Sequence, residues 1–136
     1  QKRGLEIAAK KANRTAKEGR VESYVHLGNK IGVLLEVNCE TDFVAKSDHF
    51  VIFCKDVAMH IAAMNPKYIK REDIPEEIAK QQPKVDVFAK EVCLMEQPFV
   101  KDPSKNIQDL LNALVASVGE NLFVGRFIRY KVGESE

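Results

Sequence analysis

The sequence predicts an α+β fold in which a small antiparallel β-sheet, built from a hairpin and a C-terminal strand, packs against helices. Apolar and polar residues alternate over residues 21–27 and 31–39, on either side of a Gly-Asn-Lys turn. Apolar residues recur at helical spacing over residues 47–64 and 107–118, and residues 122–132 are rich in Phe, Val, Ile and Tyr. A period of two is typical of half-buried strands and a period of 3.6 of amphipathic helices.

The composition is that of one globular domain. Of 136 residues, 45% are hydrophobic and 30% charged, which argues against disorder. The net charge is only +1, which does not favour a dedicated nucleic-acid binder. No apolar run approaches the roughly 18 residues of a membrane span, and no signal peptide is recognisable, so we expect no membrane partner. The chain lacks an initiator Met, which suggests processing or truncation. Its three widely spaced cysteines are expected to be buried thiols of a reducing compartment.

Residues 5–17 predict a first helix, with Gly19 at its C-cap. Its polar face carries the basic residues Lys10, Lys11, Arg14 and Lys17. Such a face can contact phosphates, but a solvated helix face is the commoner use of the pattern, and no aromatic side chains accompany it to stack on bases.

The hairpin register follows from matching apolar faces. A three-residue loop places Leu27 opposite Ile31 and Val25 opposite Val33, whereas a two-residue loop places Tyr24 opposite Val33. We favour the longer loop, because a slip of one residue moves every side chain to the other face.

Two helices are expected next. Residues 47–64 carry an apolar stripe, with Ser47 as N-cap and an Asn-Pro pair as the stop. Asp73 is the expected cap of a second helix, with Pro75 in its first turn and an end near residue 82.

The C-terminal third begins with residues 85–94, which are ambiguous, with helix slightly favoured. Residues 97–103 are expected to be an extended connector. Ser104 then caps a helix that Gly119 ends, and residues 122–132 form the final strand, which we expect to join the hairpin.

Sequence motifs for catalysis or cofactor binding are absent. There is no phosphate-binding loop and no dinucleotide fingerprint, so we expect no direct nucleotide binding and no cofactor. His26, His49 and His60 have no ligand-like spacing to one another or to the cysteines, so no metal site is predicted. The chain is therefore not expected to be an enzyme.

The segment that joins the second strand to the long helix contains residues that a structural role alone does not explain. Phe43 lies in the polar stretch that joins the second strand to the long helix, with Asp42 beside it. Either Phe43 folds back onto the core beside a helix-capping Asp42, or it is an exposed aromatic wedge for a protein partner.

The stretch IGVLLEVNCETDFVAK, residues 31–46, resembles the signature of the elongation factor Ts family almost residue for residue. Residues 9–19, 58–69, 97–105 and 127–134 are similar to further family stretches, so the resemblance covers nearly the whole chain.

This resemblance implies a guanine-nucleotide exchange factor for elongation factor Tu. In the family, the turn that corresponds to Thr41, Asp42, Phe43 and Val44 inserts into the GTPase domain near its magnesium site. Phe43 would wedge between helices of the partner and Asp42 would hydrogen-bond nearby, while Thr41 and Val44 complete the turn. The magnesium ion and the phosphate loop are then disturbed, and GDP leaves.

Met59 and His60 match a family helix that contacts the partner's third domain. A helix histidine that is satisfied within its own fold, or merely exposed, is an equally good interpretation of His60. The alternatives to exchange are a ribosome- or RNA-associated domain that uses the basic first helix, and an inactive truncated core.

The resemblance also implies a domain organisation. Residues 1–19 would be a linking helix after a missing N-terminal helical module, residues 20–133 the core, and residues 134–136 a tail. The chain is expected to be shorter than family members between Ile78 and Phe88. A homodimer is expected by analogy with short members. The location would be the bacterial cytoplasm, or a plastid stroma or mitochondrial matrix.

Overall fold

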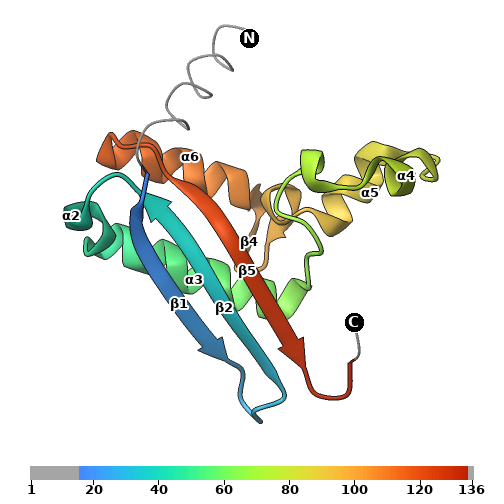
Figure 1. The fold of residues 1–136 in the computed structure, drawn as a ribbon, viewed down its shortest axis with the longest axis horizontal. Helices are drawn as coiled ribbons and strands as arrows, with labels where there is room; N and C mark the ends of the chain where they lie inside the picture. Colours follow the sequence, from blue (N-terminus) through green and yellow to red (C-terminus); the bar gives the residue numbers. More distant parts are fainter. Residues whose placement is uncertain (1–15, 135–136) are drawn as a thin grey trace, which may run out of the picture.

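The computed structural model describes residues 16–134 and confirms the α+β class. The helix predicted over residues 5–17 lies, up to residue 15, outside the described part. The main sheet has the strand order β1-β2-β5 and is antiparallel throughout, with β1 at Glu18–Val25, β2 at Ile31–Cys39 and β5 at Phe123–Lys131. The final strand therefore joins the hairpin, as predicted, and makes β2 the central strand (Figure 1).

Helices cover one face of this sheet. Helix α3, Asp48–Met64, packs across β1 and β2, and α6, Ile107–Val118, packs against α3. The inner-facing residues of β2 are almost completely buried against them. The core between the layers contains Val33, Leu35, Val37, Phe50, Val57, Ile61, Leu94, Ile107 and Leu114. The three cysteines are buried and unpaired, as expected.

The predicted hairpin register is wrong by one residue. Tyr24 lies opposite Val33 and Val25 opposite Gly32, the pairing of a two-residue loop. Gly28 and Asn29 both have positive φ, 94° and 60°, which is the backbone that twists with the flanking strands. Since the covered face of β2 is fixed by α3, Val21 and Val25 point to the uncovered face.

Gly19 was predicted to be a helix C-cap, and this prediction is wrong. Gly19 is a residue of β1 and lies opposite Asn38. Its φ is 155°, and a Cβ there would lie 2.2 Å from the carbonyl oxygen of Val37. The glycine is therefore required by the close approach of two strands.

Helix α3 has the predicted bounds, and it ends at Asn65 in the left-handed conformation. The predicted cap at Asp73 is wrong. Asp73 lies in the 3-10 helix η1, Arg71–Asp73, and its carboxylate accepts a hydrogen bond from the Lys70 N–H at 3.3 Å. Helix α4, Glu76–Lys80, has Pro75 as its N-cap residue.

Helix α5 occupies Val85–Val92, the state favoured for that ambiguous segment. Together with α4 it forms an arm that projects from the sheet in Figure 1. The arm has a small apolar cluster of its own, around Ile74, Ala89 and Cys93.

The extended connector predicted over residues 97–103 is part of a second, two-stranded sheet. After the 3-10 helix η2, Leu94–Glu96, strand β3, Pro98–Phe99, pairs with β4, Asp102–Asn106. Ser104 is in β4 and does not cap α6. The cap is Asn106, which accepts from the Asp109 N–H at 2.8 Å while the Asp109 carboxylate accepts from the Asn106 N–H at 2.9 Å. This reciprocal pair fixes the helix start two residues later than predicted.

Candidate partner-binding site

A single helical turn, α2, Asp42–Ala45, follows the end of β2. It presents Phe43 to the outside: this side chain is 84% exposed, whereas the next residue, Val44, is 5% exposed and buried in the core. Of the two readings of Phe43 left open by the sequence, the structure contradicts the one in which it folds back. An aromatic side chain this exposed is unusual in a single soluble domain, because it offers a large apolar area for burial by something else.

The turn is capped by Thr41, not by Asp42. The Thr41 hydroxyl accepts from the Val44 N–H at 3.2 Å, the usual bond of a threonine N-cap. Asp42 instead pairs with Lys46 at 2.9 Å, and both side chains are largely exposed. Its carboxylate is therefore accessible at the surface, on the residue next to Phe43 in the chain.

A carboxylate from a distant segment holds the entry to the turn. Oε1 of Glu120 accepts from the backbone N–H groups of Glu40 and Thr41, each at 3.1 Å. Oε2 of Glu120 accepts from the Thr41 hydroxyl at 2.6 Å. In return, the Glu40 carboxylate accepts from the Asn121 N–H at 2.6 Å. Sequence reasoning missed Glu120, because nothing local distinguishes it from any glutamate that follows a helix.

Cys39 completes the support from inside. Its thiol donates to the Thr41 carbonyl oxygen at 3.1 Å. Burial, and then the negative charge of Glu120, raise the pKa of this thiol to about 11. The thiol therefore stays protonated and remains a donor at neutral pH.

Met59 and His60 lie far from this turn, near the C-terminal end of α3. His60 is 12 residues beyond Asp48, where α3 begins, which is roughly 18 Å along the helix at 1.5 Å per residue. Met59 is half-buried and His60 is fully buried. Nδ1 of His60 accepts from the Val100 N–H at 3.1 Å, so Nε2 carries the proton and donates to Oε1 of Gln97 at 2.9 Å. The described structure thus favours the reading of His60 as a histidine satisfied within its own fold.

Acidification is expected to destabilise the chain through His60. Burial lowers the pKa of this imidazole below its ordinary value of 6.5, and the bond to Gln97 only partly offsets that. Between the lowered pKa and 6.5 the unfolded chain binds a proton that the folded chain does not, so stability falls as the pH drops through this window. The slope is at most about 1.4 kcal/mol per pH unit. Urea unfolding across this range, compared with His60→Gln, measures it, and equal slopes in both proteins would contradict it.

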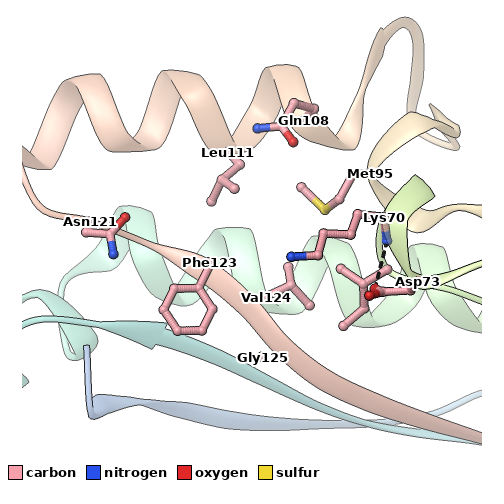
Figure 2. A pocket seen from close by; sticks show the side chains of 10 residues that line it. Lys70, Asp73, Met95, Gln108, Leu111, Asn121, Phe123, Val124 and Gly125 are labelled. Carbon is pink, nitrogen blue, oxygen red and sulfur yellow. Dashed lines mark hydrogen bonds between the residues drawn. The ribbon is translucent and has the colours of Figure 1, made fainter. Parts of the chain in front are cut away.

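A cavity of about 480 Å³ opens between α6 and β5 (Figure 2). Apolar side chains form most of its wall, and Lys70, Asp73, Gln108 and Asn121 bring polar groups to it. The side chains that line it include no cysteine, serine or histidine.

In the part of the chain that the structure describes, no three His, Cys, Asp or Glu side chains are grouped so that they could hold a metal ion. Within residues 16–134, no helix combines the length and the apolar character needed to cross a bilayer.

The fold and this site define an α+β protein whose distinctive surface feature is an aromatic side chain held out on a braced turn. Comparison with known proteins identifies the family. The family model described as elongation factor Ts matches residues 1–87 and 82–134. The chain belongs to the elongation factor Ts family, and so to the elongation factors of protein biosynthesis.

Individual relatives support the same family assignment. Elongation factor Ts of Geobacter sulfurreducens is 47% identical over 98% of this chain and 73% of its own length. The proteins of the same name from Carboxydothermus hydrogenoformans and Thermodesulfovibrio yellowstonii are each 45% identical, over 98% and 100% of this chain and 72% and 79% of their own lengths. These alignments run over 157 or 158 residues although the chain has 136, so the relatives carry additional residues within the matched region. The two stretches matched by the family model meet at residues 82–87, within the segment expected to be shortened.

Proposed function

We propose that this chain is a guanine-nucleotide exchange factor that binds elongation factor Tu in its GDP form and promotes release of GDP. The observation that carries the proposal is the exposure of Phe43 on a turn that is held by hydrogen bonds to Thr41 and by burial of Val44. Membership of the elongation factor Ts family supports it, and the resemblance of residues 31–46 to the family signature supplies the partner.

The proposed mechanism is a displacement by contact. The turn enters the GTPase beside its magnesium and phosphate site, and Phe43 is buried between helices of the partner. Asp42 exchanges Lys46 for donors of the partner. This exchange costs little, since an exposed ion pair contributes about 0–1 kcal/mol. The rearrangement weakens the hold on magnesium and on the phosphates of GDP.

The proposed contact through Met59 and His60 has less support than the one through Phe43. Met59 is partly exposed and remains a proposed contact with the partner's third domain. Because His60 is buried, we assign it a supporting role beneath that surface. No covalent step is involved, so the chain would act as a binding protein, without a cofactor or nucleotide of its own. The bacterial relatives support a location in bacterial cytoplasm.

The test is the release of fluorescent GDP from elongation factor Tu after addition of excess unlabelled GDP, with and without the chain. Acceleration that saturates with chain concentration is expected, with no GDP bound by the chain alone. Binding to the GTPase without acceleration would indicate an inactive core. Absence of both, with salt-sensitive binding to RNA, would favour the ribosome-associated alternative.

The face of the sheet that no described helix covers supports the expected homodimer. Exposed apolar side chains from all three strands gather on it: Val21, Val25, Leu34, Ile128 and Tyr130. Leu34 is on the central strand, between Ser23 and Ile128, and is 51% exposed. A patch of this kind is typical of an interface, and a second copy could cover it by packing sheet on sheet.

Leu34→Glu is expected to weaken such a dimer about 100-fold. The substitution removes the roughly 1.5–3 kcal/mol of a buried leucine and adds a carboxylate that must be desolvated beside its symmetry mate. Sedimentation equilibrium measures the change. Val87→Glu, on the exposed side of α5, is the control and should leave self-association unchanged. A parent chain that stays monomeric at high concentration would contradict the dimer.

A further inference from the structure

We propose that Glu120 is a positioning residue for exchange, one that sets the orientation of the Phe43 turn without itself contacting the GTPase. This inference rests on the proposed function, because it assigns a role within the same site. It is carried by three hydrogen bonds that join one carboxylate to the two residues that precede α2.

The turn requires an external anchor. Helix α2 has four residues, and a helix this short has too few internal hydrogen bonds to hold itself. Val44 and Ala45 anchor one side through burial. The other side, where the chain leaves β2, is anchored by Glu120, so Phe43 is held between the two anchors.

The two anchors meet at the Thr41 hydroxyl. This oxygen donates to Oε2 of Glu120 at 2.6 Å and accepts from the Val44 N–H at 3.2 Å. The carboxylate therefore fixes the hydroxyl that caps the turn. The bond from the Thr41 hydroxyl, at 2.6 Å, is the shortest of the three, and the other oxygen of Glu120 accepts from both backbone N–H groups.

Glu120 is itself held on a defined path. Gly119 ends α6 in the left-handed conformation, with φ 75°, a conformation that favours glycine at this position. The next residue, Asn121, donates its N–H to the Glu40 carboxylate at 2.6 Å. Each of the two segments thus gives a carboxylate to the backbone of the other, across 79 to 81 residues of sequence.

The test combines exchange kinetics with amide hydrogen exchange. Glu120→Ala is expected to slow GDP release at saturating chain about tenfold. Glu120→Gln keeps one acceptor oxygen and replaces the other with a donor, so its rate should lie between those of the parent and Glu120→Ala. At the hydroxyl, Thr41→Ser should be nearly as active as the parent, and Thr41→Val should resemble Glu120→Ala. Glu91→Ala, on the exposed end of α5, is the matched control for loss of a carboxylate.

Two readouts separate positioning from plain stabilisation. In a Phe43→Ala background, Glu120→Ala should cost less than a further twofold, because its effect passes through Phe43. By NMR, the Glu40 and Thr41 amides should exchange about tenfold faster in Glu120→Ala, while amides in the middle of α6 keep their protection.

The outcomes distinguish this inference from the proposed function. If Phe43→Ala is slow but Glu120→Ala and Glu120→Gln are as fast as the parent, the positioning role is overturned and the exchange function stands. Equal losses from Glu120→Ala in both backgrounds, or unchanged exchange of the Glu40 and Thr41 amides, would also overturn it. If the parent chain itself does not accelerate GDP release, the proposed function fails, and this role fails with it.

Discussion

Phe43→Ala is expected to remove most of the acceleration of GDP release while leaving the fold as stable as before. Burying one phenylalanine supplies about 1.5–3 kcal/mol, so its loss should slow exchange by about 10- to 150-fold at 1.4 kcal/mol per tenfold. Because the side chain is 84% exposed in the free chain, the free energy of unfolding should change by less than about 0.5 kcal/mol. Stopped-flow release of fluorescent GDP and urea unfolding measure the two effects.

The magnitude also bounds what Phe43 does alone. Loosening GDP a thousandfold requires roughly 4 kcal/mol of coupling, more than one phenylalanine provides, so the rest must come from the surrounding contact surface. By reciprocity, GDP must weaken binding of the chain by the same factor. Phe43→Leu should fall between parent and alanine, and Val87→Ala, which removes an exposed apolar side chain on α5, should match the parent. Equal rates of GDP release with the parent and with Phe43→Ala would contradict the role of Phe43 in exchange.

Phe50→Ala is expected to have the opposite profile. Phe50 lies seven residues further on, in the first turns of α3, and is fully buried in the main core. Truncation of a buried phenylalanine costs about 3–5 kcal/mol, a large share of the 5–15 kcal/mol typical of a whole domain. The midpoint of thermal unfolding should fall by roughly 10–20 °C.

Circular dichroism with urea or heat measures this loss. Phe50→Leu, which refills much of the volume, should cost about 1 kcal/mol. At temperatures where Phe50→Ala remains folded, it should retain more of the acceleration of GDP release than Phe43→Ala does. Phe43 is still present, and the Glu120 hydrogen bonds to the turn do not involve the core that Phe50 shares with Val44 and Ala45. A loss of stability below about 1 kcal/mol would contradict the assignment of Phe50 to the core.

The hairpin illustrates what a local pattern leaves open. Alternation correctly predicted both strands and the turn, but not which face of β1 is covered. Val21 and Val25 were expected to share a face with Val33, whereas the inner positions hold Tyr24 and Glu22. Glu22 is tolerated there because Arg20 and Lys55 approach its carboxylate at 2.8 and 3.5 Å.

Helix starts show the same limit. Asp73 and Ser104 are residue types that cap helices, yet Asp73 lies within η1 and Ser104 lies within β4. Asn106 and Pro75 occupy the cap positions instead. Capping preference acts over a few residues, and pairing with a neighbouring strand or turn overrides it.

By itself, the sequence determined the α+β class, the two long strands of the hairpin, the long helix, the final strand and the segment that carries Phe43, because periodicity and turn chemistry are local. Tertiary structure decided the rest. Among residues 16–134, helix α3 covers one face of the sheet and no helix covers the other, apolar face, and burial of Val44 turns Phe43 outward. Glu120 reaches the turn only because β5 pairs with β2. These outcomes depend on contacts between residues far apart in the chain, whose sequence spacing carries no information about which pairs will meet.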